Sequence, residues 1–313
     1  MLKGAFSNLS LPGKFVLLLL MQVCFLVFST LTGVLFLVPF YGTDIFRLIA
    51  SPDYADNSMI NALKFLQIMN NVFGMLVPAL LFAWLCTGDM ASYTGLSTPA
   101  SLVLAVVTIL VIFSAQPLIG LSSEINSRMI LPKTFSSLES WMQRSEEQAK
   151  VLTEAFLKTT SIRGLILNII IIAVLPSFTE EFLFRGVLAS LFRDLTRNIH
   201  FAVFISSFIF AAIHMQFYGF LPRFLLGMVL GYLFFWSGSL WLPVTAHFVN
   251  NLLSVILEFL YHKHLINSGS EDFGNHSSYF LYIISAVSVF SLLVFIWYKK
   301  KPIPEVEKSI RNE

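Results

Sequence analysis

Long apolar stretches separated by short polar links recur along the whole chain. The uncharged or nearly uncharged stretches cover residues 15–40, 62–86, 100–121, 164–192, 199–217, 221–237, 240–260 and 279–298. A helix needs about 20 apolar residues to cross a bilayer, so each stretch is a candidate transmembrane helix. The pattern predicts an all-α fold: a polytopic membrane bundle of about eight transmembrane helices with a polar cavity inside the membrane.

The composition supports this class. Of 313 residues, 56% are hydrophobic and only 12% are charged, whereas soluble proteins carry about 25% charged residues. The net charge of +2 is too small to indicate a nucleic-acid partner. The two cysteines, Cys24 and Cys86, lie in apolar runs and offer neither a disulfide framework nor a cysteine metal site. We therefore expect an integral membrane protein that has the lipid bilayer as a partner and binds no nucleic acid.

The distribution of basic residues predicts the orientation. With eight spans, three basic segments fall on one side of the membrane: Lys3 and Lys14, Arg193 and Arg197, and Lys299 to Lys301. Basic residues near transmembrane helices favour the cytoplasmic side. Both termini are therefore expected in the cytoplasm, and the compact chain is typical of a protein of the bacterial inner (cell) membrane.

The chain divides into four expected parts: three helices in 1–122, an extramembrane link in 123–163, a catalytic four-helix core in 164–260, and a last helix with a short basic tail in 261–313. The link carries apolar residues near helical spacing: Leu138, Trp141, Ala149, Leu152 and Phe156. Charged residues occupy its other face, so it reads as an amphipathic helix. It either lies on the membrane surface or packs as a solvated helix on the bundle.

The fourth apolar stretch contains three charges: Glu180, Glu181 and Arg185. Each costs about 2.5–3.5 kcal/mol at the centre of a membrane helix, so neighbouring helices must compensate. Glu181 and Arg185 are one turn apart and can pair. Glu180 lies about 100° round the helix and is free to face elsewhere. Pro176, upstream of these charges, frees a backbone carbonyl and can kink the helix.

Two later stretches carry polar residues at a matching depth. His214 lies at the end of the fifth, and His247 and Asn251 share a face of the seventh. With a rise of 1.5 Å per residue, Glu180, His214, His247 and Asn251 lie about 20, 22, 10 and 16 Å from the helix ends on one membrane side. Polar groups at that depth must face the bundle interior or a water-filled cavity.

This residue set suits hydrolysis. A buried carboxylate beside a histidine can activate water, and a second histidine and an amide can stabilise an oxyanion. The sequence contains no Gly-x-Ser-x-Gly elbow, which argues against an acyl-enzyme. We expect no cofactor. Zinc on Glu180, His214 and His247 is the alternative, although no His-Glu-x-x-His motif is present. A buried ionic network that only stabilises the bundle remains a further alternative.

Three motifs in order carry a family resemblance. Residues 180–185 match Glu-Glu-x-x-x-Arg, Phe210 to His214 match Phe-x-x-x-His, and His247 to Asn251 match His-x-x-x-Asn. Their order and separations over about 164–256 resemble the CAAX protease and bacteriocin-processing family, also called CPBP or Abi. These intramembrane endopeptidases are relatives of the type II CAAX prenyl endopeptidase.

The resemblance implies a membrane protease acting on a membrane-associated peptide or protein, with a prenylated or a bacteriocin-like substrate as precedents. Glu180 would activate water with help from His214, and His247 and Asn251 would form the oxyanion site. Glu181 and Arg185 would structure the motif. The family has been described both as metal-independent glutamate proteases and as metalloproteases, and we favour the former. The alternatives are a non-catalytic immunity or scaffold protein that binds a peptide, and a small proton-coupled transporter.

Overall fold

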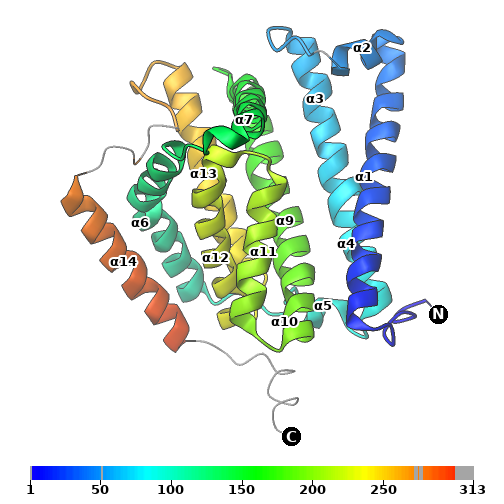
Figure 1. The fold of residues 1–313 in the computed structure, drawn as a ribbon, viewed down its shortest axis with the longest axis vertical. Coiled ribbons are helices and arrows are strands. Elements are labelled where there is room, and N and C mark those ends of the chain that lie inside the picture. The colour runs from blue at the N-terminus through cyan, green and yellow to red at the C-terminus, as the bar shows by residue number, and fades with distance from the viewer. Residues whose placement is uncertain (1, 51, 271–273, 275–277, 300–313) are drawn as a thin grey trace, which may run out of the picture.

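A computed structural model describes residues 2–50, 52–270, 274 and 278–299, and the side chains of Arg47 and Leu48 are excluded. Within that part of the chain, every regular element is a helix. The long helices run alternately up and down, side by side, as Figure 1 shows. The prediction of a polytopic helical bundle is confirmed.

The N-terminal part is a helical hairpin with a short crossing segment at its open end. Its elements, with η for a π or 3₁₀ stretch, are α1 (Leu11–Tyr41), α2 (Asp44–Ala50), α3 (Asn57–Met69), η1 (Asn70–Leu76), α4 (Val77–Cys86) and α5 (Met90–Tyr93). The stretches α3, η1 and α4 form one continuous rod that packs along α1.

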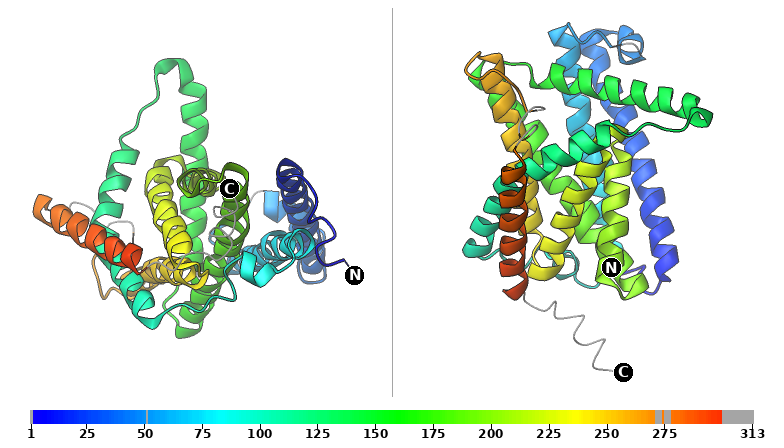
Figure 2. Two further views of the ribbon diagram at one scale, coloured as in Figure 1. Left: turned by 90° about the horizontal axis from the view of Figure 1, so that it is seen from below. Right: turned by 60° about the vertical axis from the view of Figure 1, so that its left-hand side comes forward.

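The next part rises along the opposite side of the bundle and then crosses its end. It comprises α6 (Leu102–Ser127), η2 (Lys133–Phe135) and α7 (Ser136–Leu157). Helix α7 crosses the end of the bundle and projects beyond it, as both views in Figure 2 show. Its apolar face is buried only near its C-terminal end, at Phe156 and Leu157, while Leu138 and Trp141 are exposed. The expected amphipathic helix of the link is therefore present, with its C-terminal end buried and its N-terminal half more exposed.

The remaining elements form the core and the last helix. They are α8 (Ile162–Asn168), η3 (Ile169–Val174), α9 (Leu175–Glu181), η4 (Phe182–Ala189), α10 (Ser190–Thr196), α11 (Ile199–Ile213), η5 (Phe217–Gly219), α12 (Phe220–Ser237), α13 (Trp241–His262) and α14 (Tyr279–Tyr298). The first five form one rod. This rod packs against α11 and α13, and α12 packs against α11 and α13 in turn.

Seven helices in the described part of the chain are long and apolar enough to cross a membrane. The expected fifth span, 199–217, is shorter than the sequence predicts, because α11 ends at Ile213 after 15 residues. The chain turns there, with Met215 in the left-handed region at φ 54°. Residues 214–216 thus leave the helix instead of extending it.

Small residues bring α11 and α12 into close contact. A Cβ at Gly227 would lie 3.0 Å from the Ser207 side chain, and one at Gly231 would lie 3.0 Å from Val203. These two glycines therefore set the spacing between the helices that flank the polar residues of the core.

Two buried polar contacts tie the N-terminal hairpin to the core. Lys64 Nζ donates to Asn168 Oδ1 at 2.8 Å, and Thr179 Oγ1 donates to Asn71 Oδ1 at 3.1 Å. Apolar contacts of α1 and α4 with η4 and α10 complete the join. The hairpin is thus fastened to the rod that carries the charged motif.

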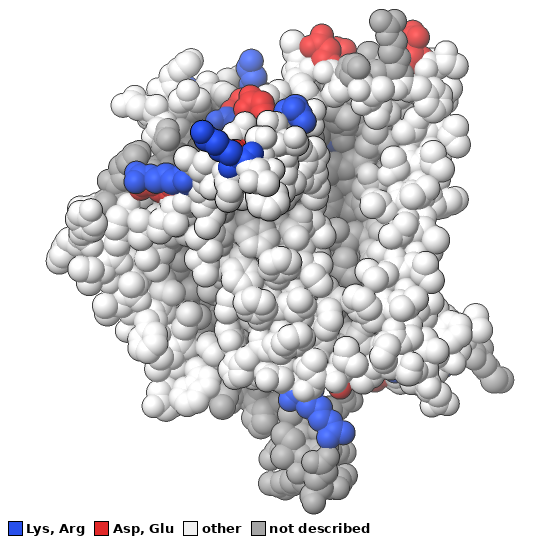
Figure 3. All heavy atoms as spheres, in the orientation of Figure 1, with Lys and Arg blue, Asp and Glu red and all other residues white. Residues whose placement is uncertain are grey.

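Charges gather at the two ends of the molecule. On the face shown in Figure 3, a broad belt without Lys, Arg, Asp or Glu separates them. The N-terminus and the end of α14 lie at one end, with the α10–α11 link, and α2 and α7 lie at the other (Figure 1). The basic segments at Lys3, Arg197 and Lys299 therefore share an end, as expected, while Lys300 and Lys301 lie outside the described residues.

The arrangement predicts a labelling pattern. In a chain with Cys24 and Cys86 replaced by alanine, single cysteines at Ser7, Arg197 and Lys299 should react with a membrane-impermeant maleimide from the same side. A cysteine at Gly42 should react from the opposite side, as a control. Labelling of Arg197 and Lys299 substitutions from opposite sides would contradict this topology.

Candidate active site

The rod from α8 to α10 is a helix interrupted by two π stretches, η3 and η4. The first directly precedes Pro176, whose missing N–H cannot satisfy the carbonyl of Ile172 four residues earlier. Asn251 Nδ2 on α13 donates to that carbonyl at 3.0 Å. The carbonyl freed by the proline is thus bound by a side chain of a neighbouring helix, and π stretches of this kind concentrate at functional sites.

The Glu181 carboxylate is the centre of the polar cluster. It is fully buried, and its Oε1 accepts from Arg185 Nη1 at 2.6 Å and from His247 Nδ1 at 2.8 Å. The Glu181–Arg185 pair predicted from their spacing is confirmed. Glu181 and Arg185 belong to the first motif, and His247 on α13 belongs to the third. This single oxygen therefore joins two motifs that are far apart in sequence.

Arg185 is also completely buried and has two further partners. Its Nη2 donates to the Gly227 carbonyl at 3.1 Å, and its guanidinium carbon lies 4.7 Å from the centre of the Phe210 ring. A cation over an aromatic face is stabilised by the ring quadrupole. Arg185 therefore links α12 and α11 to the charged motif.

Glu180 lies beside this network, but its carboxylate forms none of the network's hydrogen bonds. Its Oε2 is 3.9 Å from His247 Nε2, and its side chain is 15% exposed. A gap of that length is too long for a direct hydrogen bond. Among the described residues, Glu180 has no direct hydrogen bond, so its carboxylate is free to act on another group.

His214 caps the end of α11 close to the same cluster. Its Nδ1 donates to the Phe210 carbonyl at 2.7 Å. Phe210 itself contacts both histidine rings, with centroids 5.0 Å from His214 and 6.0 Å from His247. Since a carbonyl only accepts, Nδ1 of His214 carries the proton, and Nε2 of the neutral ring is left as an acceptor.

Asn251 lies one turn beyond His247 on α13. Its amide nitrogen holds the Ile172 carbonyl and its Oδ1 accepts from Asn250 at 3.4 Å. One amide hydrogen remains for another acceptor. The six residues singled out from the sequence thus come together as a hub of Glu181, Arg185 and His247, flanked by Glu180, His214 and Asn251.

One residue near this site escapes the three motifs. Arg223, in the first turns of α12, donates through Nη2 to Gln216, two residues after His214. Glu180 and Glu146 are the acidic groups whose charges act on it. In the sequence, Arg223 is a single charge in the otherwise apolar stretch 221–237. Charges in an apolar stretch also identify Glu180 and Arg185, so the same criterion could have identified Arg223.

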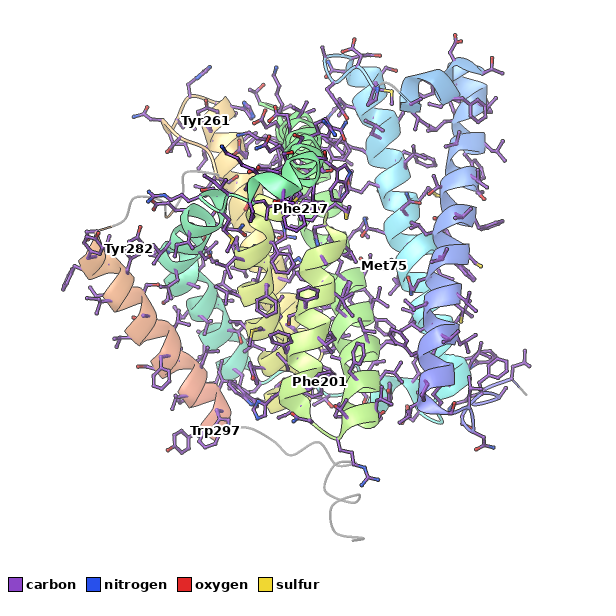
Figure 4. The ribbon with its side chains drawn as sticks, viewed as in Figure 1. Met75, Phe201, Phe217, Tyr261, Tyr282 and Trp297 are labelled. Atoms are coloured by element: carbon purple, nitrogen blue, oxygen red, sulfur yellow. The ribbon has the colours of Figure 1, made fainter. Side chains whose placement is uncertain are left out.

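Helix α7 lies over this end of the site. Glu146 Oε2 accepts from the Tyr218 backbone N–H at 3.0 Å, and Trp141 packs against Phe217 with ring centroids 5.1 Å apart. Figure 4 labels Phe217 at this end of the bundle. The link therefore covers η5, which connects His214 to Arg223.

The alternative zinc site does not fit this geometry. Within the described ranges, no group of three His, Cys, Asp or Glu side chains could hold a metal ion. In the arrangement described, Glu180, His214 and His247 are therefore not grouped as ligands of one metal ion.

Comparison with known proteins agrees with the motif pattern. Residues 162–253 match the model of a family described as type II CAAX prenyl endopeptidase Rce1-like, which confirms the resemblance inferred from the three motifs. A curated protein of Bacillus subtilis (strain 168), "Uncharacterized protein YpbD", is 35% identical over 86 residues, or 26% of this chain. The matched part spans 41% of that relative's length. No solved structure matches the chain.

The hub predicts a stability effect. Arg185→Ala removes one partner of a fully buried ion pair, which costs about 3–5 kcal/mol. The melting temperature in detergent should fall by about 5 °C or more.

Arg128→Ala is the matched control, because Arg128 pairs with Glu124 at the surface and its side chain is 74% exposed. Exposed pairs contribute about 0–1 kcal/mol, so this variant should melt close to the wild type. Equal melting of both variants would mean that the Arg185 pair does not stabilise the bundle.

Proposed function

We propose that this protein is an intramembrane endopeptidase that hydrolyses a peptide bond of a membrane-associated substrate with water activated by Glu180. One observation carries the proposal: inside an apolar bundle, Glu181 is neutralised by Arg185 and His247, while Glu180 beside it has no hydrogen-bond partner among the described residues. The family match supports the class of reaction.

In the proposed reaction, Glu180 takes a proton from a water held between its carboxylate and Nε2 of His214. The water oxygen attacks the peptide carbonyl carbon and forms a tetrahedral intermediate. The C–N bond then breaks as protonated Glu180 delivers its proton to the leaving nitrogen. No covalent enzyme intermediate forms, and each proton is accounted for by one carboxyl group.

In this proposal, His247 and Asn251 stabilise the negative charge that develops on the carbonyl oxygen of the substrate. His247 Nδ1 is bound to Glu181, and its Nε2 lies 3.9 Å from Glu180 Oε2. When both ring nitrogens carry a proton, Nε2 is a donor, and the adjacent carboxylate of Glu181 balances the charge of that imidazolium. The remaining amide hydrogen of Asn251 is the second donor, and donors fixed in advance are the effective kind.

We further propose the setting of the reaction. Both termini lie in the cytoplasm, the membrane is the bacterial cell membrane, and the substrate is a peptide or protein bound to the bilayer, with or without a lipid anchor. Lys3, Arg197 and Lys299, at the end of the bundle that carries the N-terminus, support the orientation under the positive-inside rule.

The proposal predicts loss of cleavage on removal of the base. Mass spectrometry of membrane peptides from cells producing the wild type should find products that fall at least about 100-fold with Glu180→Ala or His214→Ala, within the range that acid–base catalysis supplies. Both variants should still purify as monodisperse species.

Glu154→Ala is the matched control, because Glu154 is an exposed acid on α7 outside the site. Products that persist in Glu180→Ala would refute the role of this carboxylate. Binding of a peptide without any cleavage by the wild type would favour the non-catalytic alternative.

A second prediction separates the two mechanisms. Without a metal, Asn251→Ala should lower kcat by about 100- to 1,000-fold, the usual loss for one oxyanion donor. Dialysis against a strong chelator should leave wild-type activity intact. If chelation abolished activity and zinc restored it, with zinc lost in His247→Ala, the metal-free mechanism would be wrong.

A further inference from the structure

Arg223 holds a buried donor that the described fold leaves unused. Its Nη2 donates to Gln216 Oε1, but its Nη1 is buried and has no hydrogen-bond partner in the part of the chain that the structure describes. The guanidinium lies against Gly219, where an added Cβ would come within 2.3 Å of Nη1. The absence of a side chain at Gly219 is what gives the guanidinium this position.

The charge of Arg223 is not matched by a direct partner. An arginine stays protonated in proteins, and burying a charge without a paired counter-ion is costly. Glu146 of α7 and Glu180 of α9 act on it electrostatically, yet neither forms an ion pair with it within 4 Å among the described residues. A positive group beside the site, with one unused buried donor, is therefore available to an anion that enters the site.

Arg223 belongs to the same region as the reacting groups. Its partner Gln216 is two residues from His214, and Glu180 acts on both Arg223 and His214. A peptide whose scissile bond lies between Glu180 and His214 would thus pass close to the guanidinium.

We propose that Arg223 binds a carboxylate of the peptide substrate and so selects peptides with a negative group near the cleaved bond. This inference rests on the proposed function, because it requires a peptide in the site. A guanidinium presents parallel N–H groups that match the two oxygens of a carboxylate. Since two acidic side chains already act on Arg223, a singly charged carboxylate suits it better than a doubly charged phosphate. The carboxylate comes either from the peptide's C-terminus or from an acidic side chain.

The test measures binding without turnover. The probes are acetylated trileucine as the free acid and as the C-terminal amide, and acetylated leucine–aspartate–leucine amide beside its asparagine counterpart. Affinities are measured on the detergent-solubilised full chain. The wild type should bind one carboxylate probe about 10- to 100-fold more tightly than its neutral partner, as a charge-assisted contact implies. The pair that shows the preference identifies the source of the carboxylate.

Three variants complete the test. Arg223→Gln should abolish the preference, and Arg223→Lys should retain part of it. Gly219→Ala keeps the arginine but displaces its flexible end, so it should weaken the preference without lowering the melting temperature. Arg128→Gln, a surface control, should bind as the wild type does.

The outcomes divide cleanly. Equal binding of acid and neutral probes by the wild type, or a preference that survives in Arg223→Gln, overturns the inference. Failure of the proposed function shows separately, as cleavage that continues in Glu180→Ala, and it leaves the carboxylate preference measurable.

Discussion

A single carboxylate oxygen links the helices that form the candidate active site. Oε1 of Glu181 accepts from Arg185 on its own rod and from His247 on α13. In hydrocarbon each of these groups alone would strongly oppose insertion, so each is present only because the other two are. Arg185 extends the dependence to the Gly227 carbonyl and to the Phe210 ring. Through these contacts Glu181 and its partner Arg185 reach α11, α12 and α13, the three helices around Glu180.

The backbone of the central rod is adapted to the same end. Pro176 and the π stretch before it interrupt the regular hydrogen bonds, and Asn251 binds the carbonyl that this leaves. A second π stretch contains Arg185. The first irregularity is stabilised by a side chain of another helix, as the absence of water in the bilayer requires, and in the second Ser190 Oγ of the same rod donates to the Arg185 carbonyl. An interrupted helix and a polar site are thus two aspects of one arrangement.

Much of this site follows from the sequence by simple geometry. The pairing of Glu181 with Arg185 follows from helical spacing, and the common depth of Glu180, His214 and His247 follows from helical rise. The hydrogen bond between His247 and Glu181 could not be predicted from helical spacing. The π stretch η3 precedes Glu181 and turns the side chains after it away from the directions of a regular α-helix. The end of α11 was also missed, since residues 214–217 continue the apolar stretch without a charge. Arg223 was overlooked because a single arginine beside a proline resembles an ordinary helix start.

The shortness of α11 has a consequence for the surrounding bilayer. Fifteen residues rise only about 22 Å, against a hydrocarbon thickness of about 30 Å. A mismatch of about 8 Å is met by thinning of the lipid or by cover from protein. Helix α7 and η5 supply that cover at the His214 end. On that side, α7 and η5 rather than a full lipid leaflet therefore separate His214 from bulk water. Water can reach the site without a long hydrated channel through the bundle.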